Sequence, residues 1–141
     1  MTPKERAVRC TETLWQTDQA SRWFGMQVAE VDEGFACVYL VIEEHHCNGM
    51  GNCHGGVSYA LADSAFAFAC NSRNQLSVAQ HNSITYLAPI KLGDVVKATA
   101  RELSLVGRSG LYDVELRNQD DVVVAQFRGG SRTVKGQVFD E

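Results

Sequence analysis

Residues 48–56 read NGMGNCHGG, a glycine-rich polar loop, and residues 57–71, which follow directly, read VSYALADSAFAFACN. Within the second segment only four side chains are polar: Ser58, Asp63, Ser64 and Asn71. A helix that is apolar on nearly every side is normally enclosed by the rest of its domain. A carboxylate in the middle of such a helix is costly unless it is paired, hydrogen-bonded or used in chemistry. Asp63 is therefore the first candidate for a functional residue.

The length and charge of the chain limit what kind of protein it is. With 141 residues the chain can form one domain with a real core, but not two domains of ordinary size. The formal net charge is −4, which argues against an electrostatic grip on a phosphate backbone. We therefore expect a single domain over residues 1–141 that does not bind nucleic acid.

The cysteines and the apolar runs bear on the compartment. No apolar run approaches the roughly 20 residues needed to cross a bilayer. Residues 1–6 are charged, and no apolar stretch of the kind found in secretory signals follows them. The five cysteines are odd in number and too sparse for a disulfide scaffold. We expect a cytoplasmic protein with reduced thiols and no membrane association.

The pattern along the chain predicts a helix, two strands, the central helix and four more strands. Thr2, Pro3 and Glu5 form a strong helix start with a capping box, and we expect this helix to run to about Ser21 within an N-terminal unit of residues 1–23. Residues 135–141 are expected to form a flexible tail. The expected strands cover residues 26–31, 35–42, 76–87, 95–105, 111–117 and 122–134.

One sheet curled around one apolar helix would bury an apolar face of each element. Strands that follow one another through short turns favour antiparallel pairing. The sequence therefore predicts an α+β fold, with a long central helix at residues 57–71 wrapped by a curved, mainly antiparallel sheet of six strands. Gly129-Gly130, inside the last expected strand, indicates a bulge or the close approach of another group.

The start of the central helix has features of an oxyanion-binding site. Gly55 and Gly56 leave backbone N–H groups uncovered, and the first turn of a helix has N–H groups without internal acceptors. Together with the helix dipole, these groups could polarise a carbonyl oxygen. The alternative is that the two glycines only allow a tight turn into the helix.

Asp63 lies eight residues after Gly55, so it is roughly 12 Å further along the helix axis. It cannot serve a reacting atom held at the N-terminus of its own helix. If the two residues cooperate, they do so in a two-fold dimer whose sites combine Gly55 of one subunit with Asp63 of the other. The alternative is a buried aspartate that is hydrogen-bonded to a neighbouring segment.

Several other polar residues carry weaker hypotheses. His45, His46, Cys47, Cys53 and His54 are close in sequence, but the five residues between Cys47 and Cys53 exceed the usual two to four between paired zinc ligands. We expect no metal. The Cys53–His54 pair could form a nucleophile, although adjacency in sequence is not evidence of reactive geometry.

A wider set of residues has a specific and recognisable spacing. The set is Asn48, His54-Gly55-Gly56, Leu61-Ala62-Asp63, Ala69-Cys70-Asn71, Tyr86-Leu87-Ala88-Pro89, Gly93-Asp94, Gly110-Leu111-Tyr112-Asp113-Val114-Glu115 and Phe127-Arg128-Gly129. Over residues 25–136 the chain resembles the hot-dog-fold acyl-CoA thioesterases, and within them the hydroxyphenylacetyl-CoA thioesterases of phenylacetate degradation. The fold of that family, a long helix wrapped by an antiparallel sheet, agrees with the fold expected from the pattern.

The resemblance implies roles for individual residues. Asp63 would be the general base or the nucleophile, the Gly55 N–H would polarise the thioester carbonyl, and Asn48 would orient the thioester or the water. His54 would support the loop. Some relatives position the water with a serine on the strand after the helix, where this chain has Ala79. The expected substrate-binding residues are His54, Gly56, Ser64 and Arg108.

The resemblance also implies the reaction and the assembly. We expect an enzyme that hydrolyses an acyl-CoA, of the aryl-acetyl or benzoyl-like kind, to the free acid and coenzyme A without any cofactor. Relatives are dimers of dimers with coenzyme A at a subunit interface, so a homodimer and a homotetramer are expected. The alternatives are a hot-dog hydratase or dehydratase, which would need His46 or His54 as acid or base, and a non-catalytic acyl-CoA-binding module.

Overall fold

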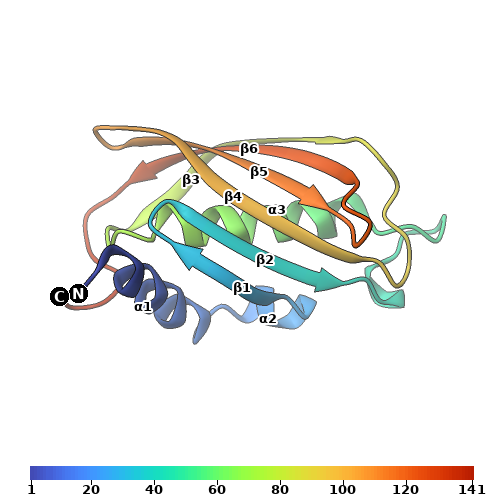
Figure 1. The fold of residues 1–141 in the computed structure, drawn as a ribbon, viewed down its shortest axis with the longest axis horizontal. Coiled ribbons are helices and arrows are strands. Elements are labelled where there is room, and N and C mark those ends of the chain that lie inside the picture. The colour runs from blue at the N-terminus through green and yellow to red at the C-terminus, as the bar shows by residue number, and fades with distance from the viewer.

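The computed structural model describes all residues from 1 to 141. Six antiparallel strands form one sheet in the order β1-β2-β4-β5-β6-β3, and the sheet curves over a long helix (Figure 1). The strands are β1 (Gln27–Asp32), β2 (Phe35–Val41), β3 (Ser77–Tyr86), β4 (Val95–Val106), β5 (Ser109–Arg117) and β6 (Val123–Thr133). The helices are α1 (Pro3–Trp15), α2 (Gln19–Phe24) and α3 (Gly55–Cys70), with a 3₁₀ turn η1 (Glu44–His46). The predicted α+β fold is confirmed.

The core lies between α3 and the concave face of the sheet. Leu61, Phe66 and Phe68 of α3 are almost fully buried, in one core cluster with Val96 and Val114 of the sheet. The alternating burial along β5 shows the same arrangement, since every second residue faces the helix. The apolar character of α3 on nearly all sides therefore has the predicted cause.

The prediction of one N-terminal helix reaching about Ser21 was wrong. Thr2, Pro3 and Glu5 form the expected start, with the complete capping box, but α1 ends at Trp15. Asp18 then caps a second helix, α2, by accepting a hydrogen bond from the Ser21 N–H at 2.9 Å. Asp favours a cap over a helix interior because its side chain competes for nearby backbone N–H groups. The restart lets α2 pack against α3, where the Ser21 hydroxyl lies 2.7 Å from that of Ser64.

The central helix also begins two residues earlier than expected. His54 is its N-cap, and its Nδ1 accepts a hydrogen bond from the Gly56 N–H at 2.9 Å. Gly55 and Gly56 are therefore the first two residues of the helix and not part of the preceding loop. This places their backbone N–H groups at the positive end of the helix dipole.

The C-terminal residues 135–141 run back to α1, so that the two ends of the chain lie together (Figure 1). The side-chain oxygen of Asn74 accepts from the N–H groups of Val138 and Phe139, and Arg6 pairs with Glu141. These contacts give the tail a defined course on the surface. Its expected flexibility stays a prediction.

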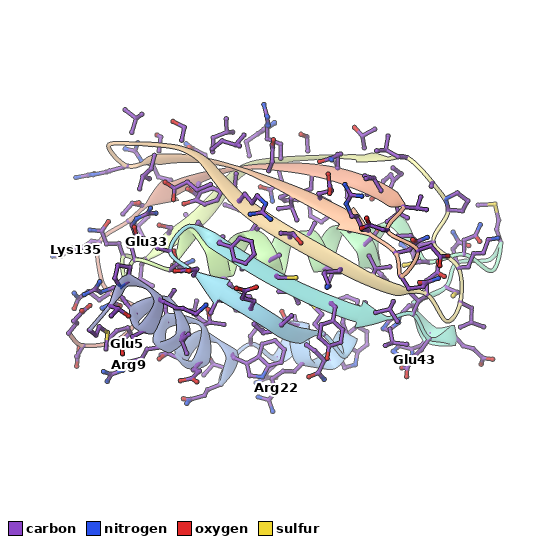
Figure 2. All side chains as sticks on the ribbon, in the orientation of Figure 1. Glu5, Arg9, Arg22, Glu33, Glu43 and Lys135 are labelled. Carbon is purple, nitrogen blue, oxygen red and sulfur yellow. The ribbon has the colours of Figure 1, made fainter.

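The surface carries charged side chains of both signs. Labelled charged side chains such as Glu5, Arg9 and Glu33 lie around the outside of the molecule and carry both signs (Figure 2). On the outer face of the sheet, Arg128 is paired with Asp113 at 2.7 Å. None of the helices is long and apolar enough to cross a membrane.

Candidate active site

The N-terminus of α3 presents one unpaired backbone donor to a cavity. The Gly56 N–H is used by the His54 side chain, and the Val57 N–H donates to the His54 carbonyl at 2.9 Å. The Gly55 N–H has no acceptor within the chain. A cavity of about 460 Å³ includes Gly55 in its lining. A carbonyl oxygen in this cavity could accept from a donor that the helix dipole strengthens.

Tyr86 explains why residue 55 has no side chain. The Tyr86 hydroxyl donates to the Gly55 carbonyl at 2.8 Å, and a Cβ on Gly55 would lie 3.0 Å from the tyrosine ring. The glycine therefore lets β3 approach the first turn of α3 closely. Tyr86 lines the same cavity, as do Leu87, Ala88 and Pro89 after it.

Asn48 organises the loop that borders this cavity. Its Oδ1 accepts from the N–H groups of Met50 at 3.0 Å and Asn52 at 3.2 Å, which holds the glycine-rich loop in a compact turn. Its Nδ2 makes no hydrogen bond within the chain, and Asn48 lines the same cavity as Gly55. The structure thus brings these two predicted residues together.

Asp63 lies in the middle of α3 and is partly buried. Asn82 of β3 donates from Nδ2 to the Asp63 Oδ1 at 3.1 Å. Burial raises the pKa of the Asp63 carboxyl above its usual value, and the hydrogen bond from Asn82 opposes that rise. The carboxylate is hence held by one neutral donor, in a place where protein atoms displace much of the solvent.

A second cavity, of about 230 Å³, lies beside Asp63 under α2. Its lining is formed by Asp18, Ala20, Ser21, Phe24, Met26, Ala60, Asp63, Ser64 and Ala67. The Ser64 hydroxyl is 2.7 Å from the Ser21 hydroxyl, which in turn donates to the Asp18 carboxylate at 2.7 Å. Ser64 and Asp63 are therefore brought together, as neighbours in one cavity.

Gly55 and Asp63 line different cavities of the same chain. Their eight-residue separation along α3 corresponds to roughly 12 Å. Arg108 is also remote from Gly55: its carbonyl accepts from the Thr133 N–H, and Thr133 pairs with Ser77, which is hydrogen-bonded to Asn71 beyond the C-terminus of α3. Within one chain the predicted site residues thus form separate groups.

His46 and Cys53 lack the properties that an acid–base or nucleophile role would require. Both ring nitrogens of the buried His46 are engaged, Nδ1 with the Glu43 N–H at 3.0 Å and Nε2 with the Phe24 carbonyl at 2.8 Å. Burial raises the pKa of the Cys53 thiol to about 11, opposite to what a thiolate nucleophile needs. No group of three or more His, Cys, Asp or Glu side chains is arranged to hold a metal ion. These findings argue against a His46 acid or base and a Cys53 nucleophile.

Sequence reasoning missed Asn82, the side chain that contacts Asp63. The alternation of β3 was the available signal, because Asn82 and the core-facing Ile84 are two residues apart and share a face. Ala79, at the expected serine position, is exposed, and so is Ser83. The register of β3 against α3, which the sequence does not contain, selects Asn82.

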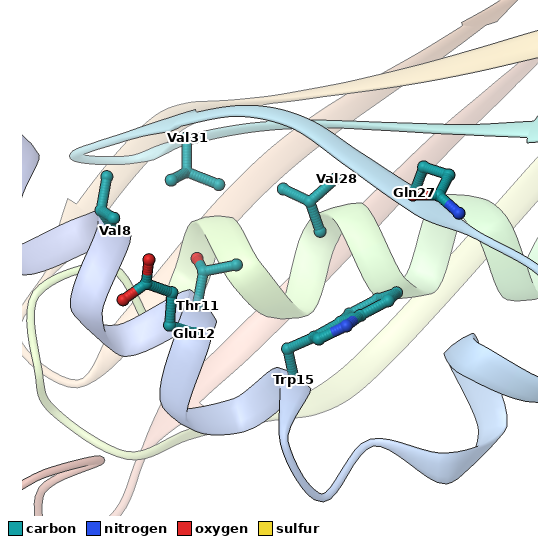
Figure 3. Close-up of a pocket in the computed structure, with 7 residues that line it drawn as sticks. All are labelled: Val8, Thr11, Glu12, Trp15, Gln27, Val28 and Val31. Carbon is teal, nitrogen blue, oxygen red and sulfur yellow. The ribbon is translucent and has the colours of Figure 1, made fainter.

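Another cavity, of about 320 Å³, lies between α1 and β1, away from these residues (Figure 3). Val8 and Trp15 of α1 face Val28 and Val31 of β1 across it, with the buried hydroxyl of Thr11 between them. It contains none of the predicted site residues.

Comparison with known proteins relates almost the whole chain to proteins of known kind. The family model described as Thioesterase superfamily matches residues 50–125. The acyl-coenzyme A thioesterase PaaI of Escherichia coli (strain K12) is 36% identical over 136 residues, which is 96% of this chain and 97% of that protein.

Solved structures give the same relation. The structure of the E. coli PaaI protein from the phenylacetic acid degradation operon superposes with a TM-score of 0.95 at 35% identity, covering 96% of this chain and 99% of that one. A mutant structure of the phenylacetic acid degradation protein PaaI from Thermus thermophilus superposes with a TM-score of 0.78 at 35% identity, covering 81% and 97%. The sheet, α3 and the N-terminal helices are thus shared with the first of these structures.

Proposed function

The chain belongs to the thioesterase superfamily and is a hot-dog-fold acyl-CoA thioesterase of the PaaI type, and we propose that its substrate is an aryl-acyl-CoA such as phenylacetyl- or hydroxyphenylacetyl-CoA. In this proposal each active site combines the Gly55 N–H and Asn48 of one subunit with Asp63 of another. The products are the free acid and coenzyme A.

The composite site is inferred from the separation of Gly55 and Asp63 along α3. A thioester whose carbonyl binds at the Gly55 N–H is too far from Asp63 of the same helix for the carboxylate to act on it. A second copy related by a two-fold axis can place its Asp63 at that carbonyl. By symmetry, Asp63 of the first copy lies at the carbonyl that the second copy binds. The sheet ends at β3, whose outward edge is unpaired and carries the exposed Val78, so an edge suitable for a second copy is present.

The chemistry requires one oxyanion donor and one base. The Gly55 N–H would stabilise the negative charge that develops on the carbonyl oxygen, helped by the helix dipole. Asp63 would take a proton from water as the water oxygen bonds to the carbonyl carbon. When the carbon–sulfur bond breaks, the sulfur would take that proton and leave as the thiol of coenzyme A. The free Nδ2 of Asn48, in the same cavity as Gly55, is available to orient the thioester.

The cavity beside Asp63 supports an aromatic acyl group. Phe24, Met26, Ala60 and Ala67 give it apolar walls, and its volume is about 230 Å³. An engineered apolar cavity of about 150 Å³ is known to bind benzene, so one ring fits the space. An acyl group that lies here would bring its thioester carbonyl next to the carboxylate.

Ser64 supports a hydroxyl on that ring. The only hydrogen of the Ser21 hydroxyl goes to Asp18, so the hydrogen between Ser21 and Ser64 must come from Ser64. Ser64 then keeps an oxygen that can accept a hydrogen bond but cannot donate a second one. A phenolic O–H is the matching partner, whereas an unsubstituted ring makes no such bond.

The remaining predicted residues have supporting or distant roles in the proposal. His54 caps α3 and, with the Gly56 N–H, holds the helix start in the geometry that leaves the Gly55 N–H free. Arg108 can reach a substrate at Gly55 only from another subunit, where it would meet a phosphate of coenzyme A.

A thiol-release assay with a panel of acyl-CoAs tests the reaction and its substrate. We expect aryl-acetyl-CoAs to be the preferred esters, and Asp63→Asn and Asp63→Ala to lose at least about 10²-fold in kcat because the base is gone. Asp113→Asn, which removes a carboxylate from the outer face of the sheet, serves as the matched control and should keep full activity. Near-normal turnover by both Asp63 variants, with their oligomeric state unchanged, would rule out the role of Asp63.

A further inference from the structure

We propose that Asn82 is a positioning residue of this hydrolysis: its Nδ2 holds the Asp63 carboxylate so that the free oxygen of Asp63 can take a proton from the attacking water. The inference rests on the proposed function, because it concerns the water that Asp63 activates. It assigns a task to a side chain that no motif in the sequence singles out.

The first observation is the contact itself. Asn82 lies on the face of β3 that meets α3, and its Nδ2 donates to the Asp63 Oδ1 at 3.1 Å. No other side-chain hydrogen bond reaches the carboxylate within the chain. One oxygen of Asp63 is therefore held by Asn82, and the other is free to accept a proton.

The second observation is an orphan acceptor on the same amide. The Asn82 Oδ1 is buried and has no hydrogen-bond partner in the structure. Folded proteins leave few buried polar atoms unpaired, so such an atom needs a reason. Because the Nδ2 is committed to Asp63, the amide cannot turn its oxygen away without losing that bond.

The two observations together define what the amide does. The Asn82 Oδ1 is closed to solvent, and Asn82 lines neither the cavity at Gly55 nor the cavity beside Asp63, so the hydrogen bond to Asp63 is the contact that its side chain makes. The Nδ2 fixes one oxygen of the carboxylate. The other oxygen can then take a proton from water while the water oxygen bonds to the thioester carbon.

The serines of β3 do not contact the Asp63 carboxylate in this chain. Residue 79 is an alanine, and Ser83 is exposed. Ser77 lies at the far end of the strand, where its N–H is bound by Asn71 and its hydroxyl lies 3.2 Å from that of Thr133. Asn82 is the polar side chain of this strand that reaches Asp63.

The same contact ties Asn82 to the pH dependence of the rate. Asp63 must be ionised to act as a base, so the rate falls as the pH drops through the pKa of this carboxyl. The groups around it are Asp18 of α2, which lines the same cavity, and Cys70 of α3, whose thiol has a pKa of about 12 and is neutral at working pH. Loss of the Asn82 donor raises the pKa of Asp63, because only the opposing effect of burial remains.

The test compares Asn82→Leu, which keeps the approximate shape and removes both polar atoms, with Ser83→Ala on the opposite face of the same strand. For Asn82→Leu we expect kcat to fall about 10- to 100-fold with KM within about twofold, and the acidic limb of the kcat profile to move to higher pH. Ser83→Ala should match the wild type in all three measurements. A kcat within twofold of the wild type and an unmoved acidic limb would overturn the proposal.

A titration of Asp63 by carboxyl ¹³C NMR supplies a reading that does not depend on turnover. The pKa of Asp63 should be higher in Asn82→Leu than in the wild type, and an equal pKa in the two proteins overturns the inference. If the leucine variant does not fold, Asn82→Ala takes its place with the same measurements. Failure of the wild type to release thiol from any acyl-CoA would defeat the proposed function, whereas wild-type activity with unaffected Asn82 variants defeats only this inference.

Discussion

Single residues of this chain acquire their chemistry from the hydrogen bonds that fix their donors and acceptors. Ser64 is an example, because its role follows from Asp18 and Ser21 and not from its own position in α3. The carboxylate at the end of the chain of hydrogen bonds sets the direction of both hydroxyl hydrogens. A serine that reads as a minor polar interruption in an apolar helix thereby becomes an acceptor facing the proposed acyl cavity.

Because Ser64 is proposed to accept a hydrogen bond from a phenolic hydroxyl, replacing it should change the selectivity between hydroxylated and unsubstituted aryl substrates. Ser64→Ala should lower kcat/KM for hydroxyphenylacetyl-CoA about 10-fold, the equivalent of one hydrogen bond worth about 1.4 kcal/mol, and leave phenylacetyl-CoA nearly unchanged. The measurement is the ratio of the two kcat/KM values. Ser104→Ala, an exposed serine on β4, is the control. An unchanged ratio would show that Ser64 does not contact the ring substituent.

At the scale of elements, α3 packs closely on β6 because Gly129 of β6 has no side chain. A Cβ on Gly129 would lie 2.8 Å from the ring of Phe66, whereas a Cβ on the adjacent Gly130 would meet the His81 carbonyl oxygen at 3.5 Å. The sequence indicated a bulge or the close approach of another group at these glycines, and the group that approaches Gly129 is the Phe66 side chain of α3. The pairing of β3 with β6 shifts by one residue between Ala79 and His81, beside Gly130.

The two glycines make a matched pair of substitutions. Gly129→Ala should lower the free energy of unfolding by about 1–3 kcal/mol, because the added methyl group overpacks the buried Phe66 ring. Gly130→Ala should change it by less than about 1 kcal/mol, since its Cβ has ordinary contacts. Denaturant unfolding of both variants provides the comparison. Equal stabilities would mean that Phe66 moves aside at no cost.

At the scale of the whole molecule, the proposed active site does not exist in one chain. The Gly55 N–H and the Asp63 carboxylate line separate cavities, and the proposal joins them through a second copy. The backbone conformation allows a proline that deletes the Gly55 N–H, although its Cβ would lie 3.0 Å from the Tyr86 ring. Gly55 is the first residue of α3, where proline is well accepted, and His54 before it has the extended conformation that a following proline requires, with φ −61° and ψ 134°.

Mixing two inactive variants tests the composite site. Gly55→Pro and Asp63→Asn should each be nearly inactive, while Gly55→Ala, which adds the same Cβ against Tyr86 but keeps the N–H, should be clearly more active than Gly55→Pro. After unfolding and refolding an equal mixture, half of the dimers carry one intact site out of two, so about a quarter of the wild-type activity should return. No recovery in mixed dimers, or a monomer with full activity, would contradict the shared site.

The sequence alone determined the central helix, the six strands, the start of α1 and the candidates Asn48, Gly55 and Asp63. Apolar periodicity, caps and turn residues are local properties, and the rise of a helix already separates Gly55 from Asp63. The sequence alone did not show the break between α1 and α2. The residues around Asp18 could either continue one helix or end it, with Asp18 as the N-cap of a second helix.

Only the tertiary structure decided which side chains serve Asp63. Asn82 is 19 residues away along the chain, and it meets the carboxylate because β3 pairs with β6 and so passes over α3 in one particular register. Ser21 meets Ser64 because α2 packs against α3. These contacts depend on long-range pairing and packing, which no local pattern encodes, and they are what turns a buried aspartate into a candidate base.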